Sequence, residues 1–161
     1  MNRLLVLTVA LGMCVTMVGC GSDPREGLVA ATIQEVEAAA TKVANIRTKI
    51  DDAVKKTETG KVPDFKEVLV EVDGLKKIAK LMQELKAKAD VLKDKTTDEE
   101  RKDLTEKNRV PLNKANERVA EARAKLNETM AAVEAQHKDA LKTVREKLIE
   151  ADAEFEAISR Q

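Results

Sequence analysis

The chain has 161 residues, with 29 basic and 29 acidic side chains and a formal net charge of +0. Only 1% of its residues are aromatic, whereas 36% are charged. Such a chain has little aromatic bulk to wall a catalytic pocket, and its interspersed charges form no basic stripe for nucleic acid. We therefore expect neither an enzyme nor a nucleic-acid-binding protein. The bias toward Ala, Glu, Lys, Leu and Arg is typical of long helices and coiled coils.

The first twenty residues have the pattern of an export signal. Arg3 precedes a run of apolar residues, Gly and Thr at 4–18. This run of about fifteen residues is shorter than the roughly 20 that span a bilayer. It leads into Met-Val-Gly-Cys at 17–20, which resembles the lipobox of bacterial lipoproteins, although Met17 stands where Leu is usual. An uncleaved anchor and an ordinary secretory signal are the alternatives.

The resemblance to lipoproteins implies a lipid anchor on Cys20. In that family the cysteine sulfur carries diacylglycerol, the chain is cleaved before the cysteine, and the new N-terminus usually receives a further acyl chain such as palmitate. Residues 1–19 would then be the signal peptide and residues 20–25 a lipidated tether. Gly21 replaces the Asp that often retains lipoproteins in the inner membrane. We expect the protein in the cell envelope, on the outer membrane facing the periplasm if the cell is Gram-negative.

The remaining chain, residues 26–161, predicts a single all-α unit. Apolar residues recur at every third or fourth position, which is the period of an amphipathic helix. Gly60 and Pro63 provide one interruption, because glycine favours a helix C-terminus and proline cannot continue a helix. The three helices are expected over residues 26–59, 64–95 and 98–160.

Three local features refine these helices. Asp64 is an N-cap type of residue for the second helix. Gly74 within that helix suggests that a neighbouring helix approaches closely, and a simple defect in the helix is the alternative. Thr97 and Glu100 have the spacing of a capping box at the start of the third helix. Pro111 lies inside that helix and removes a backbone hydrogen bond, so we expect a kink or short break at residues 109–111.

The third helix is predicted to be much longer than the other two. At 1.5 Å per residue the first two helices are about 50 Å long, whereas the third reaches about 95 Å. The expected fold is an antiparallel helical hairpin plus a longer third helix, in an elongated coiled-coil-like bundle. The overhang would expose an apolar stripe that needs a second copy, another protein or a fold-back to cover it. This possible interaction surface consists of Leu141, Val144, Leu148, Phe155 and Ile158.

His137 is the only histidine and the one candidate for metal chemistry. Glu134 and His137 have the Glu-x-x-His spacing of di-iron carboxylate bundles, but such a site needs a second histidine. Zinc sites meet the same difficulty, because no thiol would remain after cleavage and lipidation. We expect no metal and no cofactor, and we interpret His137 as a polar member of the buried helix face.

Three functions are consistent with these features. The leading hypothesis is a membrane-anchored, non-enzymatic scaffold, spacer or protein-interaction module that associates with itself or with another envelope protein. The first alternative is a tethered periplasmic chaperone or adaptor that holds client proteins on the overhanging helix. The second alternative is a carrier of lipid or another small ligand in a groove between helices.

Overall fold

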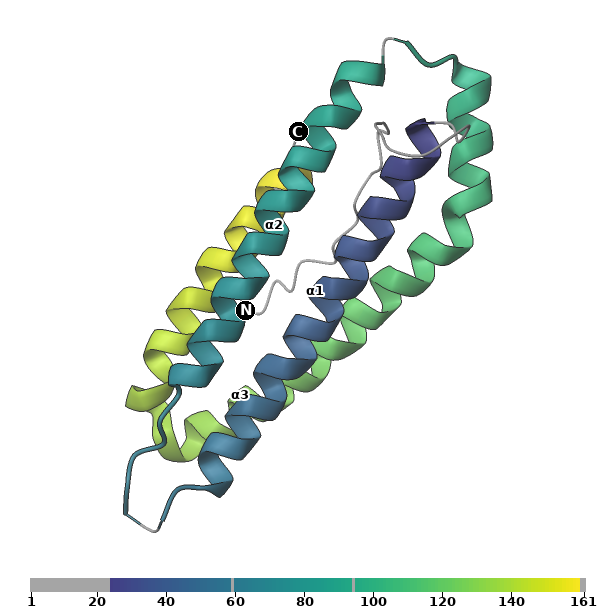
Figure 1. Ribbon diagram of the computed structural model, residues 1–161. Helices are drawn as coiled ribbons and strands as arrows, with labels where there is room; N and C mark the ends of the chain where they lie inside the picture. The colour runs from purple at the N-terminus through teal and green to yellow at the C-terminus, as the bar shows by residue number, and fades with distance from the viewer. Residues whose placement is uncertain (1–23, 59, 94, 160–161) are drawn as a thin grey trace.

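The computed structural model describes residues 24–58, 60–93 and 95–159. This part of the chain forms three helices, and none of its residues lies in a strand: α1 (Pro24–Lys55), α2 (Lys66–Lys93) and α3 (Asp98–Ser159) (Figure 1). The predicted all-α fold is therefore confirmed. The structure places the end of α1 four residues before the predicted boundary at residue 59 and the start of α2 two residues after Asp64.

Helix α3 is folded back on itself at His137. This residue has non-helical torsion angles, with φ −134° and ψ 41°, and it separates a first limb (residues 98–136) from a second limb (residues 138–159). Figure 1 shows the first limb running beside α1 and the second limb returning beside α2. The prediction of a third helix that extends beyond the hairpin is therefore wrong. A fold-back, which no local sequence signal indicates, covers the apolar stripe.

The proposed interaction surface is part of the hydrophobic core. Its side chains lie on the second limb and pack against the rest of the bundle, so they are not available to a partner. The exposed fractions are 2% for Leu141, 1% for Val144, 3% for Phe155 and 5% for Ile158, and Leu148 packs against the same core while partly buried. Burial of this face supplies the free energy that the bend requires, because each buried large apolar side chain contributes roughly 1.5–3 kcal/mol.

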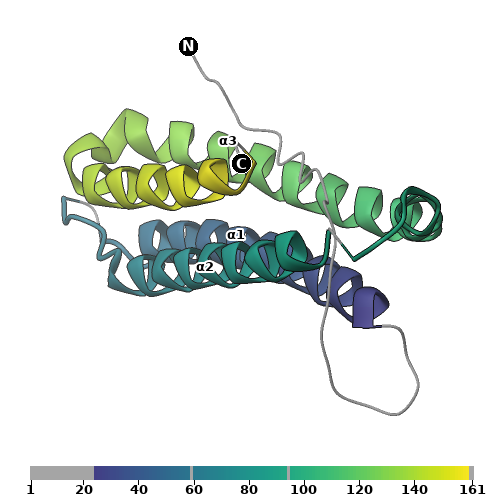
Figure 2. The ribbon, with the colours of Figure 1, turned by 90° about the horizontal axis from the view of Figure 1, so that it is seen from above.

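The bundle consists of two helical hairpins stacked face to face. Figure 2 shows α1 and α2 in one layer and the two limbs of α3 in the other. Across the layers the helices run in parallel. Glu26 pairs with Lys107 and Glu37 pairs with Arg118, and both pairs are 81 residues apart in the sequence. This constant offset fixes the register of the first limb on α1.

The second limb stops before the end of α2. Gln83 donates a hydrogen bond to the carbonyl of Glu154 at 3.0 Å, and Lys86 donates one to the carbonyl of Ile158 at 2.6 Å. Beyond this level, the described part of the chain consists of α1, α2, the first limb and the α2–α3 connection. Their ends are held by a separate small cluster consisting of Leu28, Val29 and Leu104, with Ile33, Leu85 and Leu92 packed around it.

The first turns of α3 contain the predicted capping box. The Thr97 amide donates to Glu100 Oε2 at 2.9 Å, and the Glu100 amide donates to Thr97 Oγ1 at 3.3 Å. α3 then continues through Pro111 without a break. Pro111 is exposed, so water can reach the carbonyl whose partner it removes. The axis of α3 changes direction along the first limb, as Figure 2 shows where the initial turns are seen almost end-on.

The bundle has two distinct ends. At one end, here called the entry end, α1 begins and the α2–α3 connection lies close by (Figure 1). At the opposite end, the far end, lie the α1–α2 loop and the bend of α3 at His137. The second limb runs back toward the entry end, so the C-terminal part of the bundle is not the part farthest from the start of α1. None of the helices in the described ranges has the length and apolar character needed to cross a membrane.

Candidate functional site

The predicted lipid-attachment residue lies outside the described residues. Cys20 precedes Pro24, where α1 begins at the entry end. Lipidation of Cys20 therefore remains a prediction from the sequence. The short separation along the chain means that any anchor on Cys20 would be joined to the entry end and not to the far end.

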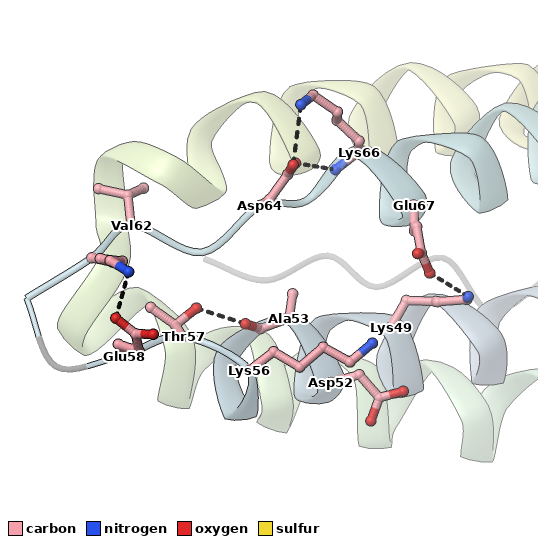
Figure 3. Close-up of a pocket in the computed structure, with 11 residues that line it drawn as sticks. Lys49, Asp52, Ala53, Lys56, Thr57, Glu58, Val62, Asp64, Lys66 and Glu67 are labelled. Atoms are coloured by element: carbon pink, nitrogen blue, oxygen red, sulfur yellow. Dashed lines mark hydrogen bonds and ion pairs between the residues drawn. The ribbon is translucent and has the colours of Figure 1, made fainter.

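The far end contains a groove beside the α1–α2 loop (Figure 3). Its volume is about 330 Å³, and the end of α1, the loop and the start of α2 form its walls. Four lysines and four carboxylates line it, so its charge is balanced. The lining residues are Lys49, Asp52, Ala53, Lys56, Thr57, Glu58, Lys61, Val62, Asp64, Lys66 and Glu67. We call this feature the far-end groove.

Several of the charges in the far-end groove are paired with one another. Lys49 Nζ lies 2.5 Å from Glu67 Oε2, and this hydrogen bond lowers the pKa of Glu67 and raises that of Lys49. The Lys66 amide donates to Asp64 Oδ1 at 3.0 Å and lowers the pKa of Asp64 (Figure 3). These shifts keep the carboxyl groups ionised at neutral pH. The groove is therefore suited to polar contacts with a partner, whereas a general acid would need a raised pKa.

One polar contact lies inside the α3 hairpin. Arg123 on the first limb is 8% exposed, and its Nη2 donates to Asp152 Oδ1 on the second limb at 2.5 Å. The Arg123 guanidinium also lies 5.9 Å from the centre of the Phe155 ring. Burial raises the pKa of Asp152, and the neighbouring Arg123 opposes that shift. This contact ties the two limbs together.

Arg123 was not predicted to be buried, although the sequence contains a signal for its position. Arg123 lies between Val119 and Leu126 at helical spacing, on the face that both of these buried residues share. Its Nε atom has no hydrogen-bond partner, and the same is true of the buried oxygens Asn116 Oδ1 and Glu154 Oε2. The buried face of the third helix therefore includes a charged residue that we did not predict.

The Glu-x-x-His pair lies at the bend. Arg145 binds both oxygens of the Glu134 carboxylate, at 2.6 and 2.7 Å, so this carboxylate is occupied by a guanidinium. His137 is partly exposed at the bend, and its interpretation as a member of the buried face is wrong. Among the residues that the structure describes, no group of three or more His, Cys, Asp or Glu side chains could hold a metal ion.

The inside of the bend is hollow. The space has a volume of about 230 Å³ and opens to solvent between the two limbs. Buried Leu141 contributes to its lining, and the other side chains around it are charged. The complete lining is Glu134, Lys138, Asp139, Leu141, Lys142 and Arg145. A solvent-open space therefore lies between Glu134 on the first limb and the first turns of the second limb, whereas farther along the buried side chains of Arg123 and Phe155 lie between the limbs.

Comparison with models of known protein families, with curated proteins and with solved structures found no match to this chain. The fold defines the class of this protein: it is an all-α bundle of three helices in which the third helix is folded back on itself. The chaperone hypothesis required an apolar overhang for client proteins. Because that face is buried within the bundle, the surface it invoked does not exist in this fold.

Proposed function

We propose that the protein is a lipid-anchored, non-enzymatic module of the cell envelope that presents its far end to another protein. The observation that carries the proposal is that the two ends of the bundle differ in their position relative to Cys20. The lipobox-like Cys20 lies just before the entry end, whereas the α1–α2 loop and the bend lie at the opposite end. With 32 residues, α1 is about 48 Å long, so the far end would stand well above an anchoring membrane.

The chemistry of the far end supports a contact with a protein. The far-end groove offers charges of both signs, and Val62 in the loop is 73% exposed. A polar rim around an exposed apolar side chain is a common arrangement in protein interfaces. The balanced charge gives no preference for a polyanion such as nucleic acid.

The lipid anchor is tested with labelled palmitate and fractionation of cells. We expect label in the native chain and its recovery with membranes, and loss of both in Cys20→Ser. Cys14→Ser is the matched control, since Cys14 lies within the predicted signal peptide and should leave labelling unchanged. Equal labelling of Cys20→Ser and the native chain would refute the anchor.

The orientation is tested by photo-crosslinking in cells from two valines at opposite ends. Val62 lies in the α1–α2 loop, and Val110 lies near the entry end, where neighbouring Lys107 pairs with Glu26. Their exposed fractions are nearly equal, 73% and 70%. We expect adducts to a discrete protein partner from Val62 and few from Val110. Adducts only from Val110 would contradict a partner at the far end.

A further inference from the structure

The bend of α3 consists of residues that ordinarily continue a helix. Residues 134–140 contain neither Gly nor Pro, and His137 is the residue that leaves the helical region. Leaving that region interrupts backbone hydrogen bonds that a straight helix would make. The backbone around His137 therefore favours a straight helix, and the bent form is stabilised by tertiary contacts of the second limb.

The tertiary contacts of the second limb are made at a distance from the bend. Its apolar face lies against the core, and on its α2 side Lys76 forms an ion pair with Glu150, Gln83 binds the Glu154 carbonyl and Lys86 binds the Ile158 carbonyl. None of these contacts depends on the two limbs being joined at His137. The second limb of another copy of the chain could make all of them identically.

Straightening the bend breaks few side-chain contacts at the bend itself. The space inside the bend is already hollow, with a volume of about 230 Å³. The contact across it that would be lost is the Glu134–Arg145 pair, whose side chains are 26% and 53% exposed. Exposed ion pairs are weak because solvent screens them. The bend therefore has the character of a hinge.

We propose that α3 straightens at His137 and that two copies of the chain exchange their second limbs. Exchange of identical elements is a low-cost route to a two-fold symmetric dimer, because each bundle regains its native contacts. The closed monomer competes with the exchanged dimer, because its own second limb is present at a high effective concentration. The balance is set by the helical hydrogen bonds gained at two straightened hinges and by the protein concentration.

The position of the hinge determines the shape of the exchanged dimer. A straightened second limb continues away from the entry end, and it must enter the partner bundle from that bundle's far end. The two bundles therefore meet by their far ends and have their entry ends at opposite extremes. With two α1 helices of about 48 Å end to end, the starts of α1 lie on the order of 100 Å apart. If Cys20 is lipidated as proposed above, this dimer would link two facing membrane surfaces.

The exchange is tested with a chemical cross-link that reports which chain supplies the second limb. In the full chain, purified in detergent and carrying Cys14→Ser and Cys20→Ser, the pair Lys76→Cys and Glu150→Cys replaces the ion pair between α2 and the second limb. After reaction with a short bismaleimide, which spans a gap that long side chains bridged, we expect covalent dimers on a denaturing gel, in a fraction that rises with protein concentration. The single variant Glu150→Cys gives the background from collisions. Dimers no more abundant than in that single variant at every concentration would overturn the proposal.

Two substitutions at the hinge residue form a matched pair. Alanine is the best helix former, and glycine disfavours a straight helix by about 1 kcal/mol per hinge relative to alanine. With two hinges per dimer, His137→Ala should dimerise about 30-fold more tightly than His137→Gly, as measured by sedimentation equilibrium. The dimer should be nearly twice as long as the monomer in small-angle scattering. Equal dimerisation of the two variants, or a dimer of unchanged length, would refute exchange at this hinge.

The exchange and the proposed function fail in different experiments. The cross-linking and hinge variants report on limb exchange, and both are made in the chain that carries Cys20→Ser and cannot be lipidated there. The palmitate and fractionation experiment reports on the anchor regardless of whether limbs exchange. Only the linking of two membranes requires both.

Discussion

Arg123 and Asp152 join the two limbs of α3 from positions 29 residues apart, with 2.5 Å between Arg123 Nη2 and Asp152 Oδ1. The guanidinium is almost fully buried, whereas the carboxylate side chain is 46% exposed. The pair therefore neutralises a charge inside the hairpin while one of its members stays in contact with water. The Phe155 ring beside Arg123 adds a contact on the same limb as Asp152.

Removing the carboxylate should cost more than removing the whole pair. Asp152→Ala removes the hydrogen-bond acceptor that Asp152 offers to the buried Arg123 guanidinium in either protonation state, and we expect a loss of about 1.5–3 kcal/mol in the free energy of unfolding. The double variant Arg123→Met with Asp152→Ala keeps an apolar side chain against Phe155 and should recover most of that loss. Urea unfolding followed by circular dichroism gives both values. A double variant no more stable than Asp152→Ala would contradict this account of Arg123.

The second limb should be as sensitive to truncation as any part of the core. Phe155→Ala removes a buried ring and should destabilise the protein by about 3–5 kcal/mol. Ile149 lies on the same limb but is 62% exposed, so Ile149→Ala should change stability by less than about 0.5 kcal/mol. Thermal and urea unfolding would compare the two. Similar small effects for both would indicate that the second limb is not packed on the bundle in solution.

Gly74 should tolerate alanine. A Cβ atom there would lie 3.0 Å from Lys42 Cε, which is near the flexible end of a side chain that crosses from α1 to bind Glu71 at 2.7 Å. Alanine gains roughly 1 kcal/mol of helix propensity, and displacing an ion pair near the surface costs up to about 1 kcal/mol. We expect a net stabilisation of about 0.5 kcal/mol for Gly74→Ala. The expected close approach of a neighbouring helix at Gly74 is wrong, because the atoms nearest to it belong to the Lys42 side chain.

The control for Gly74→Ala is the same substitution in a Lys42→Ala background. There the side chain that meets the new Cβ is absent, so the full gain of roughly 1 kcal/mol should appear. Denaturant midpoints of the native chain and the three variants complete the cycle. Destabilisation in the Lys42→Ala background would show that another contact at Gly74 matters more.

Stability should fall as the pH falls below about 4.5. Hydrogen bonds lower the pKa of Glu67, Glu121 and Glu150 in the folded protein, and the main donors are Lys49, Lys125 and Lys76 respectively. A lowered pKa stabilises the fold above the ordinary value of 4.5, and this contribution is lost as the pH falls through the folded-state pKa. Unfolding curves between pH 7 and pH 3 would measure the decline. Constant or rising stability over that range would contradict it.

Asp152 should act in the opposite direction. Burial raises its pKa, so the folded state binds its proton more readily than the unfolded state, and protonation favours folding as the pH falls through the raised pKa. Asp152→Asn removes this opposing contribution. The acid-induced decline should therefore be steeper in Asp152→Asn than in the native chain, each measured relative to its own value at pH 7. A shallower decline would mean that the pKa of Asp152 is lowered in the fold.

Much of the local structure was accessible from the sequence because it depends on contacts between near neighbours. The three-to-four-residue period of apolar side chains predicted three helices, and Thr97 and Glu100 predicted the capping box that starts α3. The pattern also identified the apolar face of the second limb, with Leu141 and Phe155 among its residues. We predicted that this face would be an interaction surface, but it is part of the hydrophobic core of the same chain. The identity of Cys20 as the anchor candidate rests on the sequence alone.

The path of the chain at His137 was decided only by tertiary structure. Residues 134–140 favour a continuous helix, and no local rule opposes one. The bend forms because a straight α3 would leave the apolar face of the second limb in water, and folding back buries it against α2 and the core. The bend also produces the features that could not be predicted from the sequence. It brings Arg123 against Asp152, turns the C-terminal part of the bundle back toward the entry end and puts the bend beside the α1–α2 loop, because each depends on residues that meet only after the hydrophobic core has formed.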